Sequence, residues 1–136
     1  MTNLYPYLSF DGNAEEALNL YKEIFNGKIE MIMRFQDAPF PTDESDKNKI
    51  MHARLVFDNN LIIVADRMRK NDDTKILNVQ LMLHLKDEEK TEIIFSKLST
   101  DGIVVMPLSI QFWGNKYGIV KDKFGIDWML DCEMKN

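Results

Sequence analysis

Apolar residues recur along this chain with two different spacings, and these spacings predict helices and strands. After Asn13 and again after Asp87, apolar side chains lie three or four positions apart, which is the spacing of one face of an α-helix. Asn13 followed by Glu16 has the form of a capping box, and Asp87 is also a good N-cap. The predicted buried stripes are Ala17, Leu18, Tyr21, Ile24 and Phe25 in the first helix, and Thr91, Ile94, Phe95 and Leu98 in the second.

The two predicted helices belong to an internal repeat. Asn26-Gly27 ends the first helix and Asp101-Gly102 the second, each with a residue that tolerates a left-handed conformation. One strand-like run precedes each helix and three follow it: residues 4–10, 28–35, 50–57 and 61–66 in the first half, and 79–85, 103–109, 116–121 and 126–132 in the second. Each half is therefore predicted to be a βαβββ module, at about residues 1–70 and 76–136.

Three connections in the first half carry further predictions. Residues 36–49 form a polar stretch with Pro39 and Pro41, which is either a lid over a site or a surface insertion. The sequence Asp58-Asn59-Asn60 predicts a hairpin turn between the last two strands. Because Pro6 cannot donate a hydrogen bond to a ladder, the first strand is expected at a sheet edge or paired across a subunit boundary.

Alternation along the predicted strands separates two faces of each sheet. One face is apolar and suits packing against the helices: Leu4, Leu8, Phe10, Leu81, Leu83, Leu85, Trp128 and Leu130. The other mixes aromatic, polar and sulfur-containing side chains: Tyr5, Tyr7, Ser9, Gln80, Met82, His84, Asp127, Met129 and Asp131. This second face has the composition of a cavity lining, although a solvent-facing sheet has a similar pattern.

Composition narrows the class of protein. A chain of 136 residues, 45% hydrophobic and 29% charged, is an ordinary size and composition for one soluble domain. The net charge of −5 argues against nucleic-acid binding, and no apolar window is long enough to span a membrane. The N-terminus lacks a secretory pattern, so a cytoplasmic location is expected. The single Cys132 excludes an internal disulfide and is expected to be buried.

Specific motifs resemble a known family. Pro6 to Phe10 runs into Gly12 to Ala17, and the chain continues with Leu20-Tyr21, Phe25, Phe112-Trp113-Gly114, Tyr117-Gly118, Asp122, Phe124-Gly125 and Trp128. In a tandem βαβββ chain they resemble the vicinal-oxygen-chelate superfamily of glyoxalases, bleomycin-resistance proteins and extradiol dioxygenases. The similarity is greatest to its PhnB-like branch, also called the demethylubiquinone methyltransferase-like domain. The resemblance covers nearly the whole chain.

The resemblance implies a fold and an assembly. The fold is α+β, a single glyoxalase-like domain over residues 1–136 in which two modules form a U-shaped mixed sheet around a small-molecule cavity, with the helices outside. A homodimer is common in the family. It is also expected here because half-barrel modules leave strand edges and apolar surface exposed.

The resemblance also indicates where a metal would bind. Enzymes of the superfamily hold a divalent ion with His or Glu side chains on the first and last strands of the modules. The corresponding positions here are Tyr5, Gln80 or Met82, and Met129, none of which is a normal ligand for such an ion. No metal is therefore expected. No other cofactor is expected either, because no Gly-rich strand-to-helix turn offers a site for S-adenosylmethionine.

The residues themselves leave one metal alternative open, and they suggest a set of cavity residues. His52 and His84 with Asp131 or Glu133 have the composition of a two-histidine, one-carboxylate site. Arg54 shares a strand face with His52 and suits either an anionic ligand or a structural salt bridge. Trp113 and Trp128 are expected to be packing residues. The expected ligand-binding set is Tyr5, Tyr7, His52, Arg54, Gln80, Met82 and Met129.

Three functions fit these observations. The first is metal-free binding of an unknown small molecule, the second a divalent-metal-dependent lyase or dioxygenase, and the third sequestration of a cationic drug by an acidic protein of the bleomycin-binding type. Ser9, Ser109 and Cys132 have no histidine placed beside them by any visible motif. Catalytic residues are therefore unknown, and enzymatic activity is left open. The expected partners are a small molecule and a second copy of the chain, with no nucleic acid and no membrane.

Overall fold

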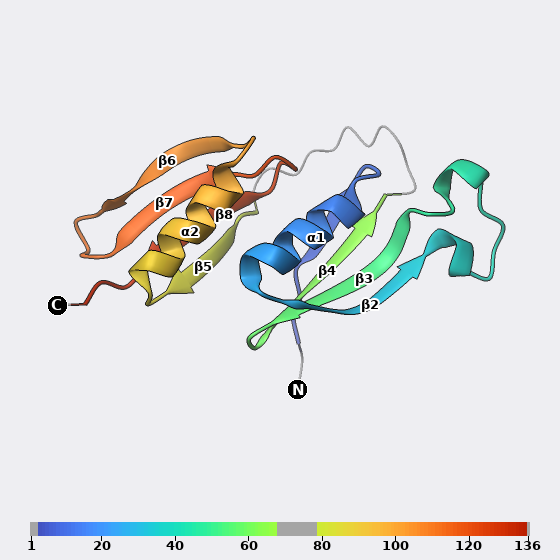
Figure 1. Ribbon diagram of the computed structural model, residues 1–136, viewed down its shortest axis with the longest axis horizontal. Helices are drawn as coiled ribbons and strands as arrows, with labels where there is room; N and C mark the ends of the chain where they lie inside the picture. Colours follow the sequence, from blue (N-terminus) through green and yellow to red (C-terminus); the bar gives the residue numbers. More distant parts are fainter. Residues whose placement is uncertain (1–2, 68–78, 136) are drawn as a thin grey trace. The chain divides into compact units, whose positions relative to one another are not determined.

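A computed structural model describes residues 3–67 and 79–135 of the chain (Figure 1). By its internal contacts the chain forms two compact units, Met1–Asp73 and Thr74–Asn136. Each unit consists of one helix and a four-stranded mixed sheet in the order βαβββ. The predicted α+β class and tandem modules are confirmed. The predicted module boundary, between about residues 70 and 76, lies outside the described residues.

The first unit has a sheet with the strand order β1-β4-β3-β2, in which β1 and β4 are parallel and the other neighbours antiparallel. Two short 3₁₀ turns, η1 and η2, lie in the connection between β2 and β3. The elements are β1 (Tyr7–Phe10), α1 (Ala14–Phe25), β2 (Lys28–Arg34), η1 (Phe35–Asp37), η2 (Glu44–Asp46), β3 (Ile50–Phe57) and β4 (Asn60–Asp66).

The second unit repeats this topology, with the strand order β5-β8-β7-β6 and a parallel β5–β8 pair. Its connection between β6 and β7 is short, whereas the first unit has the insertion with η1 and η2 at the equivalent place. The elements are β5 (Leu81–Leu85), α2 (Glu88–Ser99), β6 (Ile103–Ile110), β7 (Lys116–Lys121) and β8 (Asp127–Cys132).

The first strand of each unit is shorter than predicted. The structure begins β1 at Tyr7, and Leu4, predicted on the buried face, is 95% exposed. Pro6 lacks an N–H, but its carbonyl accepts a hydrogen bond from the Ile63 amide at 3.0 Å, just before the regular ladder starts. β1 lies at the edge of its sheet, as Pro6 predicts. In the second unit β5 begins at Leu81, so Gln80 precedes the strand.

The core of each unit lies between its helix and one face of its sheet. All predicted members of the two helical stripes are buried, and Ala14 joins the first. Leu8, Phe10, Trp128 and Leu130 are buried on the sheet side, so strand alternation assigned these faces correctly. Cys132 is also fully buried, as expected for a free thiol in an apolar strand.

The two helices are capped in different ways. In α2 the Asp87 side chain accepts a hydrogen bond from the Lys90 amide at 3.0 Å, which confirms the predicted cap. The capping box predicted at Asn13 is wrong, because the Asn13 side chain makes no capping hydrogen bond. Instead Asp66, at the end of β4, accepts hydrogen bonds from the amides of Gly12 and Ala14 at 2.9 and 3.0 Å. A residue distant in sequence therefore caps α1.

The glycine after each helix is required by a close approach to a strand. Asn26 and Asp101 take the left-handed conformation, with φ of 51° and 58°, while the following glycines do not. A Cβ on Gly27 would lie 2.9 Å from the Val56 carbonyl oxygen, and one on Gly102 would lie 2.4 Å from that of Lys121. The repeated glycines therefore let each helix–strand connection pass against a strand of the same sheet.

Substitution of Gly102 by alanine is expected to lower the free energy of unfolding by about 2 kcal/mol, because backbone atoms must shift to admit the methyl group. Urea unfolding followed by circular dichroism measures this change. Ser96→Ala, an exposed change in the middle of α2, is the control and is expected to have an effect within about 0.5 kcal/mol of zero. Equal stability of G102A and the wild type would contradict the close approach of Gly102 to the Lys121 carbonyl.

The outer edge of the second sheet is apolar. β6 is the edge strand, and its residues Ile103, Val104, Val105 and Ile110 are exposed. Phe112, just beyond this strand, is 97% exposed. Pro107 lies inside β6, between positions where the register with β7 shifts. None of the helices in residues 3–67 and 79–135 has the length and apolar character needed to cross a membrane.

Candidate functional site

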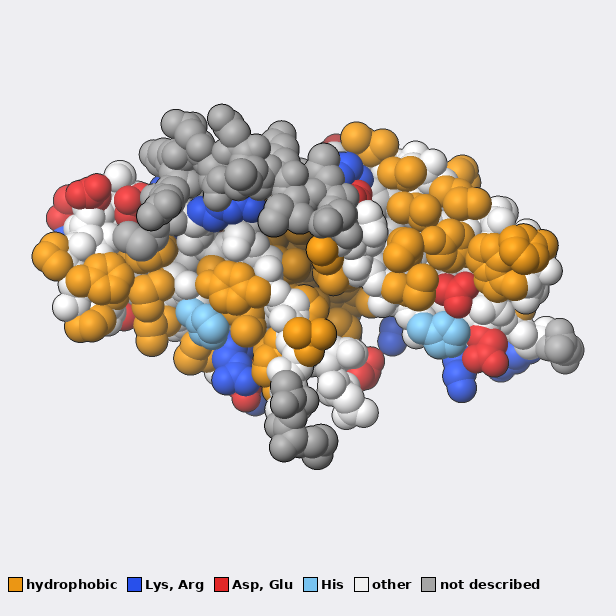
Figure 2. Space-filling model, turned by 180° about the vertical axis from the view of Figure 1, so that it is seen from behind, with side chains coloured by type: hydrophobic (Ala, Val, Ile, Leu, Met, Phe, Trp, Pro, Cys, Tyr) orange, Lys and Arg blue, Asp and Glu red, His pale blue; other side chains and the backbone are white. Residues whose placement is uncertain are grey.

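The face of each sheet opposite its helix is the candidate binding surface. Figure 2 shows these faces, on which hydrophobic side chains lie among a few histidine and charged side chains. Two of the exposed side chains are large and belong to the predicted cavity set: Tyr7 is 54% exposed and Met82 is 53% exposed. These surfaces, called the open faces below, combine apolar area with a small number of polar groups, as ligand sites do.

On the first open face, β1, β2 and β3 bring predicted residues together. Directly opposite residues in an antiparallel pair point to the same side, and His52 lies opposite Met33 while Arg54 lies opposite Met31. Arg54 also lies opposite Ile63 on β4, whose partner on β1 is Tyr7. The rings of Tyr7 and His52 are 6.3 Å apart between centroids, at 54°. Tyr7, His52 and Arg54 therefore share one surface, which two methionines flank.

Arg54 has an ion-pair partner on this face. Its Nε lies 3.5 Å from Glu30 Oε2, at the register shift between Ile29 and Met31 in β2. Nε itself is buried and makes no hydrogen bond within the described part of the chain, because the contact with Glu30 lacks hydrogen-bond geometry. The guanidinium is therefore held beside the sheet, and the Arg54 side chain is 38% exposed. A partly exposed guanidinium can donate a charged hydrogen bond to an anion such as a carboxylate.

On the second open face, β5, β7 and β8 place methionines beside polar groups. Met82 pairs in register with Met129, and His84 with Asp131. The Tyr117 hydroxyl donates to the sulfur of Met129 at 3.1 Å. The two methionines of the predicted cavity set thus lie side by side. Their flexible thioether side chains can adapt to different ligands.

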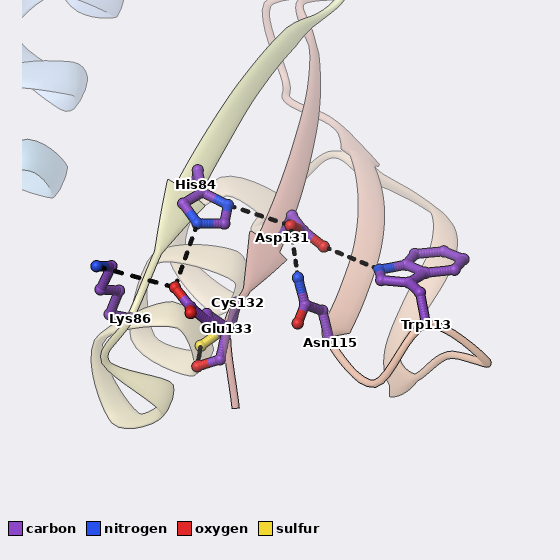
Figure 3. Close-up of polar contacts among 7 residues, drawn as sticks. All are labelled: His84, Lys86, Trp113, Asn115, Asp131, Cys132 and Glu133. Carbon is purple, nitrogen blue, oxygen red and sulfur yellow. Dashed lines mark hydrogen bonds and ion pairs between the residues drawn. The ribbon is translucent and has the colours of Figure 1, made fainter. Parts of the chain in front are cut away.

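Asp131 is the centre of the polar contacts on this face (Figure 3). Its carboxylate accepts hydrogen bonds from Asn115 Nδ2 at 3.0 Å and from Trp113 Nε1 at 3.3 Å, and lies 3.1 Å from His84 Nδ1. Its side chain is only 15% exposed. The other imidazole nitrogen, Nε2, lies 3.7 Å from Glu133 Oε2, which Lys86 also approaches. Asp131 therefore fixes the positions of a histidine, an amide and an indole.

His84 lies between two carboxylates. Its Nδ1 faces Asp131 and its Nε2 faces Glu133. The His84 side chain is 52% exposed, so a bound molecule can reach it.

The structure places the predicted set unevenly. Tyr7, His52 and Arg54 meet on one open face, and Met82 and Met129 meet on the other. Tyr5 and Gln80 are exposed and lie just before β1 and β5, outside the regular strands. That these residues bind a ligand stays a prediction.

Sequence reasoning missed the role of Trp113 and Asn115. Trp128 packs in the core, whereas the Trp113 ring lies partly exposed beside Tyr117, with centroids 5.4 Å apart, and its N–H donates to Asp131. Packing of Trp113 at a dimer interface stays a prediction. Asn115 follows Trp113 in the β6–β7 turn. Strand alternation does place Asp131 on the open face. A carboxylate on a largely apolar face is a signal that neighbouring donors will surround it.

The residues of the metal alternative have other contacts. Within residues 3–67 and 79–135, no three or more His, Cys, Asp or Glu side chains form a group that could hold a metal ion. Asp131 accepts hydrogen bonds from the neutral donors Asn115 and Trp113. The absence of a metal ion stays a prediction.

Comparison with known structures first defines the class of fold. A solved glyoxylase/bleomycin resistance protein/dioxygenase domain from Frankia sp. EAN1pec has a TM-score of 0.65 and 12% identity, over 97% of this chain and 92% of that one. At this identity the likeness concerns the fold alone. The chain thus shares the fold of this glyoxylase/bleomycin resistance protein/dioxygenase domain.

The family follows from stronger matches. Protein PA1353 from Pseudomonas aeruginosa is 34% identical, with a TM-score of 0.90, over 99% of this chain and 100% of that chain. The PhnB protein from Bacillus cereus is 28% identical, with a TM-score of 0.83, over 97% and 100%. The sequence profile of the family described as 3-demethylubiquinone-9 3-methyltransferase matches residues 2–130. The chain belongs to this family, and the predicted resemblance to the PhnB-like branch is confirmed.

Proposed function

We propose that this protein binds a small organic molecule on its open sheet faces without a metal ion. The observation that carries the proposal is the combination of exposed apolar side chains with a few oriented polar groups, Arg54 on one face and the Asp131–His84 pair on the other. Such a surface provides area for an apolar ligand and groups that set its orientation. The methyl-transfer reaction in the family's name is not carried over, since the chain has no Gly-rich strand-to-helix turn for S-adenosylmethionine.

The positive charge of Arg54 favours carboxylates as the class of ligand for the first open face. A carboxylate ligand would gain a charged hydrogen bond from the guanidinium and apolar contact with Tyr7 and Met31. Small aromatic and branched carboxylic acids are the probes, and saturation-transfer NMR on the full chain detects their binding. We expect Arg54→Gln to weaken binding of these acids by about tenfold or more, because a charged hydrogen bond is lost.

Lys28→Gln is the matched control for this experiment. Lys28 is exposed at the start of β2 and does not belong to the predicted ligand-binding set. It is expected to leave affinity within about twofold of wild type. Equal weakening by both variants would show that general charge, not Arg54, attracts the acids. Elemental analysis of protein purified without chelators tests the other half of the proposal: stoichiometric Ni, Mn, Fe or Zn would overturn it.

We further propose that the chain is a homodimer. The support is the exposed apolar edge at β6 together with Phe112, because an apolar surface of this kind marks a protein–protein contact in many soluble proteins. Light scattering at micromolar concentration is expected to give the mass of two chains. A monomeric mass would contradict this assembly.

A further inference from the structure

The first unit contains a cavity that is separate from its open face. Its volume is about 110 Å³, and its walls are Phe35, Pro41, Thr42, Asp43, Asp46, Lys49 and Arg67. None of the predicted ligand-binding residues lines it. We propose that this cavity binds a small zwitterion, specifically a short α-amino acid such as alanine or glycine. Its walls are held by hydrogen bonds, they carry charges of both signs, and its volume is that of a very small ligand.

The walls are held in place by the backbone. The Phe35 amide donates to the Lys49 carbonyl at 3.1 Å, which closes the insertion at its base, and the Asp46 amide donates to the Asp43 carbonyl at 2.9 Å. Thr42 Oγ1 donates to the Phe35 carbonyl at 3.3 Å. Phe35 is buried and forms an apolar wall. Because these contacts exist without a ligand, binding requires little ordering of the loop.

Two cations supply donors for a carboxylate. Arg67 Nη1 lies 3.3 Å from both carboxylate oxygens of Asp11. A guanidinium has five N–H donors in a planar fork, so one such group can bind two carboxylates at once. Lys49 Nζ lies 2.7 Å from Asp46 Oδ1, and this hydrogen bond raises the pKa of Lys49. Lys49 therefore stays positively charged in the cavity wall.

A carboxylate is also available for an ammonium group. Asp43 is exposed at the start of η2, and within the described part of the chain its side chain neither caps that turn nor forms an ion pair. The walls therefore carry two positive and two negative side chains, of which Lys49 and Asp46 pair with each other. A ligand with both charges can place its carboxylate beside Arg67 and its ammonium group beside Asp43, which favours a zwitterion.

The size of the cavity limits the ligand. An apolar cavity of about 150 Å³ accommodates benzene with its six non-hydrogen atoms, so the volume of about 110 Å³ here fits a ligand of roughly five such atoms, and a sixth atom would reach the cavity mouth. Glycine and alanine have this size. Phe35 and Pro41 offer an apolar wall for the methyl group of alanine, which predicts a preference for alanine over glycine. Larger amino acids would have to extend their side chains through the cavity mouth.

Titration of the full chain with L-alanine, followed by ¹⁵N–¹H NMR, tests the proposal. We expect shifts at the amides of residues 35, 42, 43, 46, 49 and 67, with a Kd on the order of 1 mM, which is reasonable for so small a ligand. Acetate and methylammonium each carry only one of the two charges. Each is expected to bind at least about tenfold more weakly than alanine, because one charged contact is missing.

Two variants locate the site, and two controls lie in the same loop. Arg67→Gln and Asp43→Asn are each expected to weaken alanine binding by about tenfold or more. Lys47→Gln and Glu44→Gln remove the neighbouring exposed ion pair, which does not line the cavity, and are expected to leave affinity within about twofold. Absence of shifts at 50 mM alanine, roughly fifty times the expected Kd, would overturn the proposal. So would acetate binding as tightly as alanine, or equal weakening by the control variants. Binding of organic acids at Arg54 is read from different amides, so the two sites fail independently.

Discussion

Replacement of Asp66 by alanine is expected to lower the free energy of unfolding by about 3–5 kcal/mol. The Asp66 carboxylate is buried and accepts hydrogen bonds from the amides of Gly12 and Ala14, at the start of α1, and from the Ile50 amide at the start of β3 at 3.0 Å. It thus joins the end of β4 to a helix and a second strand. Alanine would leave the buried amides of Ala14 and Ile50 without this acceptor and would remove a negative charge from the N-terminus of α1.

Urea unfolding measures the loss in Asp66→Ala, and hydrogen exchange locates it. The amides of Gly12, Ala14 and Ile50 are expected to lose protection first, because their acceptor is gone. Asp58→Asn is the control: Asp58 is exposed in the β3–β4 turn with φ of 51°, a conformation that asparagine also tolerates. A change of less than about 1 kcal/mol in Asp66→Ala would show that water replaces the carboxylate at no great cost.

Asp122→Ala is expected to have an effect of similar size in the second unit, about 3–4 kcal/mol. Asp122 begins the turn between β7 and β8. Its buried carboxylate accepts hydrogen bonds from the amides of Phe124 and Ile126 at 2.9 and 3.0 Å, and from Trp128 Nε1 at 2.9 Å. Trp128 is fully buried, so alanine removes a hydrogen bond from a buried indole N–H.

The Asp122 effect is separable from a general loss of turn structure. Near-ultraviolet circular dichroism reports on the environment of Trp128. In Asp122→Ala this signal is expected to weaken while the far-ultraviolet signal of the helices is still present. Asp101→Asn, an exposed change at a residue with φ of 58°, is the matched control and is expected to stay within about 0.5 kcal/mol of wild type. An unchanged Trp128 spectrum in Asp122→Ala would contradict the role assigned to the indole hydrogen bond.

The repeat and the buried faces were predictable because their signals are local. Helical stripes and strand alternation depend on residues within one element, and the structure buries every predicted stripe member. The ends of elements were less predictable. β1 starts only after Pro6, whose carbonyl pairs with Ile63 of β4, and Asp66 at the end of β4 takes the place of Asn13 as the cap of α1. Both outcomes depend on residues more than 50 positions away, which local sequence patterns do not reveal.

The candidate site shows the same division. Alternation places Tyr7, Met82, Met129 and Asp131 on the open faces, but it does not reveal what surrounds them. Asp131 on β8 contacts His84 on β5 and Asn115 just before β7. These contacts depend on the register in which the three strands pair, which the sequence does not state. The cavity in the first unit depends on how residues 35–49 fold back on themselves, which their polar composition does not specify.

The edge strand β6 has a consequence for the folding of the chain. Its exposed apolar residues and unpaired backbone groups resemble the segments through which partly folded chains add to one another and aggregate. Pro107 interrupts this strand and cannot donate a hydrogen bond to an incoming chain, leaving Ile103–Met106 on one side and Leu108–Ile110 on the other. The proline therefore acts as a gatekeeper: it limits growth of intermolecular sheets at the edge where the molecule is most vulnerable to them.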